Sequence, residues 1–148
     1  MLRRAVRLAV APGSVSEPRG RQAPRPADTT ILVVDDDPVT LTLVERTLRA
    51  EGYRVWTANR ASDARQLLGE LAGAVDLVLT DVSMPGGLGT DLAVQIRSSQ
   101  RWVKVLFMSS HPWEHLQKDG LDIPESQLLR KPLLAAQLVD RIRDALTA

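Results

Sequence analysis

The sequence predicts a doubly wound α/β fold, in which helices cover both faces of a parallel sheet. Two observations support this prediction. From residue 30 onward, short apolar runs rich in β-branched residues alternate with segments whose apolar residues recur at helical spacing. Short loops join the two kinds of segment, and strands that alternate with helices in this way form right-handed units with parallel strands.

Composition limits the chain to one domain of ordinary size. Its 148 residues are 44% hydrophobic, which is enough for one core but not for two comfortable ones. The absence of cysteine excludes disulfides, thiolate zinc sites and a cysteine nucleophile. No apolar run approaches the roughly 18 residues of a membrane span. We therefore expect a soluble protein of the cytoplasm.

Residues 1–29 form a basic tail in front of the predicted domain. They contain six arginines against Glu17 and Asp28, whereas the rest of the chain has more acidic than basic residues. Proline, glycine, serine and arginine dominate residues 11–29, and such a segment lacks the apolar area that offsets the entropy of ordering. We expect residues 1–29 to be disordered, with a weak contact to nucleic acid or membrane as the alternative, and residues 30–148 to form the domain.

The first strand and helix show clear boundary signals. Ile31–Val34 is the strand, and Asp37 then offers an N-cap before Pro38 at the first helical position. Gly52 supplies the C-terminal stop. The inward stripe of this helix has the spacing i, i+3, i+4, i+7, i+8 and consists of Thr40, Leu43, Val44, Thr47 and Leu48.

The remaining elements continue the alternation. A second strand spans Tyr53–Ala58. A second helix closes near Gly73, and its inner face consists of Ala61, Ala64, Leu68 and Leu71. A third strand, Asp76–Thr80, ends on Asp81. After a glycine-rich loop come a helix over about Asp91–Ser99, a fourth strand from Val103, a fifth from Gln127, and a last helix with Leu134, Leu138, Ile142 and Ala145 on one face. The stretch His111–Ser126 has no clear amphipathic repeat, so we expect it to be short-helical or irregular.

Polar residues end four of the five predicted strands. Asp35 and Asp36 follow the first strand, Asp81 the third, Ser109 the fourth and Lys131 the fifth. In open α/β sheets the site lies beyond the carboxyl ends of the strands, near the point where the winding reverses. In the flavodoxin-like strand order 2-1-3-4-5, these residues would meet at one rim. Each alone is more often a turn, cap or solvated residue, so the prediction depends on their joint occurrence.

The order of these residues resembles the receiver (phosphoacceptor) domains of two-component response regulators over about residues 30–147. The acidic pair after the first strand is followed by Asp81-Val82-Ser83-Met84-Pro85, with Gly89 eight residues after Asp81, then by a hydroxyl residue after strand four and by Lys131-Pro132. In VLFMSS and in the weak pattern after His111, the sequence is most similar to the receivers of hybrid histidine kinases.

The resemblance implies a role for each residue at the end of a strand. Asp81 would accept a phosphoryl group from a phosphohistidine on a histidine kinase or a histidine phosphotransfer protein. Ser109 would hydrogen-bond the phosphoryl oxygens on activation, and Lys131 would form an ion pair with them. Ser109 replaces the commoner threonine and keeps its hydroxyl. Ser110 stands where the family prefers alanine or glycine, and Leu128 replaces a switching tyrosine or phenylalanine, so a readout through an aromatic rotamer cannot operate.

Magnesium gives the run of three aspartates a physical reason. Adjacent like charges repel, and a buried one needs a cation or a proton. By the same resemblance, Asp35, Asp36, Asp81 and the backbone carbonyl of Ser83 are the metal ligands, and this hard cation suits one or two carboxylates together with a phosphate and waters. The cation also favours the ionised Asp81 that must attack phosphorus. Asp37 lies one residue too far along, and we expect it to cap the first helix.

Two other functions fit parts of the sequence. The run Asp35–Val39 also fits the D-x-D-x-[TV] motif of haloacid-dehalogenase-type phosphatases, with Asp35 as the nucleophile, but this leaves Met84, Pro85 and Gly89 unexplained. The other is a receiver-shaped interaction module that works without phosphorylation.

We favour a single-domain response regulator that catalyses only its own phosphorylation and dephosphorylation and switches the binding of an unknown downstream target. No nucleic-acid or membrane partner is expected for the domain, because it is net acidic and no helix-turn-helix segment follows it.

Overall fold

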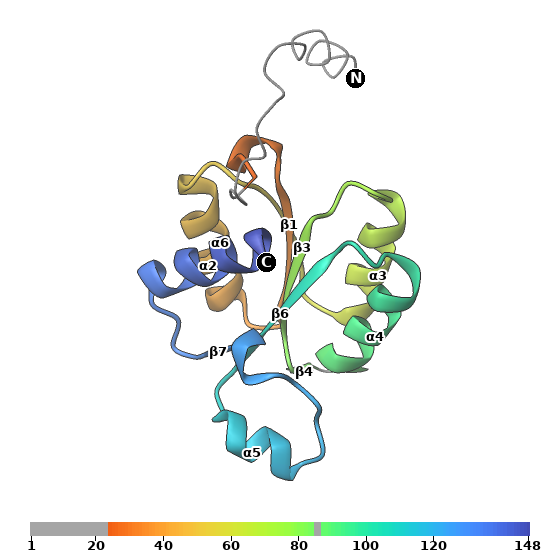
Figure 1. The fold of residues 1–148 in the computed structure, drawn as a ribbon, viewed down its shortest axis with the longest axis vertical. Coiled ribbons are helices and arrows are strands. Elements are labelled where there is room, and N and C mark those ends of the chain that lie inside the picture. The colour runs from red at the N-terminus through yellow and green to blue at the C-terminus, as the bar shows by residue number, and fades with distance from the viewer. Residues whose placement is uncertain (1–23, 85–86) are drawn as a thin grey trace, which may run out of the picture.

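The computed structural model describes residues 24–84 and 87–148 and confirms the doubly wound fold (Figure 1). Within these residues, five parallel strands form one sheet in the order β2-β1-β3-β6-β7, which is the predicted order 2-1-3-4-5. The strands are β1 (Thr30–Val34), β2 (Arg54–Ala58), β3 (Leu77–Asp81), β6 (Lys104–Ser109) and β7 (Leu128–Arg130). The prediction of disorder in residues 1–23 lies outside the described residues.

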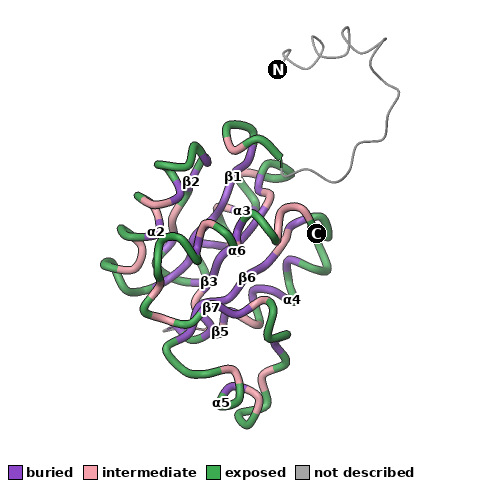
Figure 2. Tube along the Cα trace, turned by 60° about the vertical axis from the view of Figure 1, so that its left-hand side comes forward, coloured by how far each residue is buried: buried purple, intermediate pink, exposed green. Residues whose placement is uncertain are grey.

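Four helices form the outer layers of the domain (Figure 1). On one face of the sheet lie α2 (Pro38–Ala50) and α6 (Ala135–Thr147), and on the other lie α3 (Ala61–Glu70) and α4 (Gly89–Ser99). Successive strand residues point to opposite faces, so Ile31 and Val33 enter the α2/α6 core while Leu32 and Val34 enter the α3/α4 core. Burial on both faces explains why the central strands are continuous apolar runs. Figure 2 shows buried positions along these strands and exposed positions on the outer sides of the helices.

Asp37 caps α2 as the sequence predicts, but the buried stripe of α2 is narrower than predicted. Val44 and Leu48 are fully buried, whereas Leu43 is 43% exposed. In α6, Leu138 and Ile142 are buried as expected. Leu134 was expected on the same face, but it is the N-cap residue that precedes the helix, and it is 65% exposed. Helical spacing therefore identified the centre of each apolar face and overestimated its edges.

Regular structure is present just before the predicted domain boundary at residue 30. Pro26–Asp28 form a short 3₁₀ helix, η2, and Thr29 is buried. The backbone N–H of Arg54 donates to the carbonyl of Thr29 over 3.0 Å, which extends the pairing of β1 with β2. Residues 24–29, assigned to the tail on composition, thus include a segment that packs against the sheet.

The weakly patterned stretch after His111 contains two short helical segments, as predicted. α5 (Trp113–Lys118) has six residues, and η3 (Glu125–Gln127) is a single 3₁₀ turn. Side chains hold the loop between them: the Trp113 indole N–H donates to the Ile123 carbonyl over 2.7 Å, and the Gln117 amide donates to the same carbonyl over 3.2 Å. Ile123 is buried and belongs to the α3/α4 core, which anchors the segment.

No helix among residues 24–84 and 87–148 combines the length and apolar character needed to cross a membrane.

We expect the amide protons of α5 to exchange faster than those of α2 and α6. A six-residue helix with one buried side chain, Leu116, opens at low free energy. Trp113→Phe removes the indole donor and should speed exchange further around residues 116–123, while α2 and α6 keep their rates. Hydrogen exchange followed by NMR measures both effects. Protection in α5 equal to that in α6 would contradict this assignment.

Candidate functional site

The carboxyl ends of β1, β3 and β7 bring four charged side chains together. Asp35 and Asp36 follow β1, Asp81 is the last residue of β3, and Lys131 follows β7. One carboxylate oxygen from each of the three aspartates lies within 4.8 Å of the others. The Lys131 Nζ lies 2.7 Å from Asp35 Oδ2 and 3.3 Å from Asp81 Oδ2. The parallel register creates this rim, because it makes the three strands end at the same edge of the sheet.

Asp35 is the most buried member of the cluster, at 0% exposure. Its Oδ1 accepts a hydrogen bond from the backbone N–H of Asp37 over 2.9 Å. Its Oδ2 has no aligned hydrogen-bond donor among the described residues, and its contact with Lys131 is an ion pair. A buried carboxylate oxygen with spare lone pairs requires a cation. Lys131 supplies one, and the clustered carboxylates of Asp36 and Asp81 are oxygen ligands for a second.

The donor set fits a magnesium ion. Asp35 is buried, Asp81 is half-buried and Asp36 is exposed, so the carboxylates lead from the interior to solvent. Magnesium prefers oxygen ligands and keeps several waters, which matches carboxylates on one side and open solvent on the other. The backbone carbonyl of Ser83, in the short strand β4 (Ser83–Met84), follows Asp81 by two residues.

Burial acts in opposite directions on the pKa values of the two partners of the Asp81–Lys131 ion pair. Burial raises the pKa of Asp81, the negative charge of Asp35 raises it further, and Lys131 only partly opposes these effects. Burial alone would lower the pKa of Lys131, but its contact with Asp35 and the charge of Asp81 outweigh burial and raise that pKa. Lys131 is therefore cationic at neutral pH, whereas the ionised form of Asp81 lowers the stability of the fold.

Thr80 and Gly89 fix the backbone of Asp81. The Thr80 hydroxyl is fully buried and donates to the Asp81 carbonyl over 2.9 Å. At Gly89, a Cβ atom would collide with the same carbonyl oxygen and would lie 3.0 Å from Thr80 Oγ1. This close approach explains the spacing from Asp81 to Gly89. Sequence reasoning missed Thr80, although a hydroxyl residue in an otherwise apolar buried strand was the available signal.

A cavity of about 410 Å³ opens beside Asp81. Ser83, Ser109, Ser110 and His111 line it together with Asp81. Ser109 is buried, and its Oγ accepts a hydrogen bond from the backbone N–H of His111 over 2.9 Å, which leaves its own proton available to donate. Of the three clustered aspartates, Asp81 is the one among the residues that line this space. His111 was not singled out as a site residue from the sequence.

Asp37, the third aspartate of the run, does not join the cluster. Its Oδ1 accepts from the N–H of Val39 over 3.1 Å, and its Oδ2 accepts from the Thr40 hydroxyl over 2.8 Å. These bonds hold the pKa of Asp37 below its usual range, with the hydroxyl of Thr40 as the largest cause. The predicted role as the cap of α2 is confirmed.

We expect Asp81→Asn to stabilise the metal-free protein measurably at neutral pH. Because folding raises the pKa of Asp81, ionised Asp81 lowers stability above that pKa. The cost disappears as the pH falls through the raised value and Asp81 takes up a proton. The difference between variant and wild type should therefore shrink in mildly acidic solution. Urea unfolding in the presence of a chelator measures it.

Asp37→Asn is the matched control, because asparagine caps a helix as well as aspartate does and Asp37 lies outside the cluster. It should give no such gain. Destabilisation by Asp81→Asn would show that the ionised Asp81 carboxylate does not lower the stability of the fold.

Comparison with known proteins agrees with the fold. The family model described as the response regulator receiver domain matches residues 31–143. The aerobic respiration control protein ArcA of Escherichia coli K12 is 32% identical over 117 residues, which cover 79% of this chain and 48% of ArcA. The chain thus spans about half the length of that relative.

Solved structures show the same similarity. The receiver domain from the hybrid histidine kinase CckA is 31% identical, with a TM-score of 0.66 and coverage of 79% of this chain and 98% of that one. The response regulator TrrA from Thermotoga maritima, solved in complex with Mg²⁺ and BeF, is 28% identical, with a TM-score of 0.69 and coverage of 80% and 99%. The similarity to receivers of hybrid kinases is confirmed by the first of these. With most of its length matched by the family model, this chain belongs to the response regulator receiver domains of two-component signalling.

Proposed function

We propose that Asp81 is the phosphoacceptor and that Asp35, Asp36, Asp81 and the Ser83 carbonyl hold the Mg²⁺ that the transfer requires. One observation supports the choice of Asp81 most strongly: of the clustered aspartates, Asp81 is the one that lines the cavity. Asp81 Oδ2 also lies 3.3 Å from the ammonium of Lys131. The donor in this proposal is a phosphohistidine on a histidine kinase or a histidine phosphotransfer protein.

In the transfer step, an oxygen of Asp81 attacks phosphorus while the bond from phosphorus to the donor imidazole nitrogen breaks. The imidazole leaves with the electron pair, and an acyl phosphate forms on Asp81. Lys131 neutralises charge on the phosphoryl oxygens, since its Nζ already contacts Asp81 Oδ2. A bound magnesium ion would add charge neutralisation and alignment, which are the main contributions to this chemistry. Attack of water on the acyl phosphate then returns the Asp81 carboxylate and releases inorganic phosphate.

The site is connected to the segments that would report phosphorylation. The backbone N–H of Lys131 donates to the Ser109 carbonyl over 2.8 Å, which ties the end of β7 to the end of β6. Ser109 Oγ holds the N–H of His111, which lies two residues before α5. Rotation of the Ser109 side chain toward a phosphoryl oxygen would break this hydrogen bond and release the His111 backbone. We infer that phosphorylation changes the population of two arrangements of β6, β7 and α5, and so switches partner binding.

The geometry does not favour the phosphatase with Asp35 as nucleophile. Asp35 is fully buried, its Oδ1 is bonded to the N–H of Asp37, and it is not among the described residues that line the cavity. A nucleophile must reach its substrate in line, and Asp81 meets this condition better. The close approach of Gly89 to the Asp81 carbonyl also gives Gly89 a role beside the proposed phosphoacceptor, which the phosphatase hypothesis did not. A receiver-shaped module that works without phosphorylation is the alternative that the next experiment tests.

Incubation with magnesium and a small acyl-phosphate donor should label Asp81. Reduction of the aspartyl phosphate followed by peptide mapping by mass spectrometry locates the bond. Asp81→Asn should abolish labelling, because an amide is a far poorer nucleophile. Asp36→Asn should slow it sharply, since Asp36 is a proposed metal ligand.

The control in this experiment is Asp37→Asn, which changes the neighbouring aspartate and keeps the helix cap, so it should be labelled at the wild-type rate. Label on Asp35 with turnover of phosphomonoesters would identify a phosphatase. Absence of label from a protein that demonstrably binds magnesium would favour the interaction module.

A further inference from the structure

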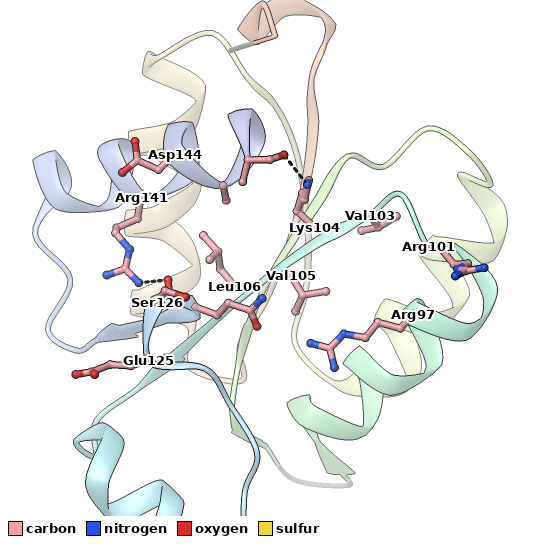
Figure 3. A pocket seen from close by; sticks show the side chains of 13 residues that line it. Arg97, Arg101, Val103, Lys104, Val105, Leu106, Glu125, Ser126, Arg141 and Asp144 are labelled. Carbon is pink, nitrogen blue, oxygen red and sulfur yellow. Dashed lines mark hydrogen bonds between the residues drawn. The ribbon is translucent and has the colours of Figure 1, made fainter. Parts of the chain in front are cut away.

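A second groove lies along the first half of β6 (Figure 3). Asp81, at the carboxyl end of β3, is not among the residues that line it. Its volume is about 790 Å³, within the range of ligand sites. It exists because β7 has only three residues and pairs with β6 at Phe107–Ser109 alone. Lys104–Leu106 pair with β3 on one side, and no described residue pairs with them on the other. The first half of β6 is therefore a free strand edge between α4 and α6.

The backbone of Val105 faces this groove. In a parallel ladder, the N–H and C=O of alternate residues point to the same neighbour. Lys104 donates its N–H to the Asp76 carbonyl over 3.0 Å, so Lys104 and Leu106 direct their backbone groups toward β3. Val105 consequently directs its N–H and C=O outward. A free edge of this kind is a template for an added strand.

The α4 wall of the groove carries uncommitted positive charge. Arg97 and Arg101 are both exposed, and no described residue pairs with or accepts a hydrogen bond from either. Figure 3 shows Arg97 reaching from α4 toward the groove. Arg97 lies in the last turn of α4 and Arg101 in the turn that follows the helix, and both line the groove. Each guanidinium group can bind one carboxylate through two parallel N–H···O hydrogen bonds.

The opposite wall differs in charge. Arg141 of α6 is committed, because it donates to the carbonyls of Ser126 and Leu128 over 2.6 and 2.9 Å. The remaining charged groups of this wall include the acidic Asp144 and Glu125. The α6 side, with Lys104 bonded to the Ala148 carbonyl, therefore has mixed charge beside apolar residues. The α4 side has the exposed Arg97 and Arg101.

We propose that the free edge of β6 binds an extended acidic segment of a partner protein, which adds as a strand beside Val105 and directs its carboxylates toward Arg97 and Arg101. Successive side chains of a strand point to opposite faces, so alternate residues of the segment are acidic. Those between them are apolar and lie on the α6 side against Leu106 and Ala145. The chain's own residues 1–23 are poor occupants, since they hold five arginines against Glu17.

A short peptide in which valine alternates with glutamate tests the proposal. With a fluorescent label, it should bind the full chain with an affinity that falls as salt rises. In ¹⁵N spectra, the exchange of the Val105 amide should slow on binding, as strand addition requires. Arg97→Glu and Arg101→Glu should each weaken binding by at least about fivefold. Arg54→Glu changes an exposed arginine at the other edge of the sheet, on β2, and should leave the affinity unchanged.

Changes to the peptide separate strand addition from simple charge attraction. N-methylation of the amides that face β6 should abolish binding, whereas N-methylation of the alternate amides should have little effect. Lysine in place of glutamate should also abolish it. Equal binding by both methylated peptides, an unprotected Val105 amide, or competition by inorganic phosphate alone would overturn the proposal in favour of a small-anion site. No binding at low salt would overturn it outright. The arginine variants keep the Asp81 cluster intact, so these outcomes are independent of phosphorylation.

Discussion

The ammonium of Lys131, placed between the carboxylates of Asp35 and Asp81, is the interaction on which the rim of this domain depends. Nζ contacts both, at 2.7 and 3.3 Å, and so links the ends of β1, β3 and β7. Two carboxylates in this environment repel each other, and an unpaired buried charge costs several kcal/mol. One lysine reduces that cost without removing it, which is why the pKa of Asp81 stays above its ordinary value.

This incomplete neutralisation connects stability with function. Three clustered aspartates face one protein cation, so the site retains negative charge that a divalent cation can offset. The backbone under Asp81 is fixed by Thr80 and by the close approach of Gly89, so the carboxylate stays at the cavity wall. Ser109 and His111 also line that cavity, and they come just before α5, so in the proposed function they carry the response to phosphorylation. Asp81 and Ser109, which end the neighbouring strands β3 and β6, thus place the proposed phosphoacceptor beside the proposed reporter.

Features fixed by chain order were predictable, and features fixed by packing were not. Asp35, Asp81 and Lys131 end the first, third and fifth strands of a parallel sheet in which β1, β3, β6 and β7 lie in that order, so their convergence followed from strand order alone. Thr80 went unnoticed, because nothing in the spacing shows which buried hydroxyl supports a neighbouring carbonyl. The exposure of Leu43 and Leu134 depends on where a helix meets its neighbours. The free edge of β6 could not be predicted for a similar reason. The sequence predicts a fifth strand, but only the fold shows that β7 pairs with half of β6.

The affinity for Mg²⁺ of Lys131→Met, compared with that of the wild type, tests the central claim most directly. Methionine keeps the length and the apolar stem of lysine but removes the ammonium. If Lys131 and the metal share Asp35 and Asp81, isothermal titration should show tighter magnesium binding by the variant, while its unfolding free energy without metal falls. Unchanged or weaker binding by a folded Lys131→Met variant would contradict the claim that these carboxylates serve both cations.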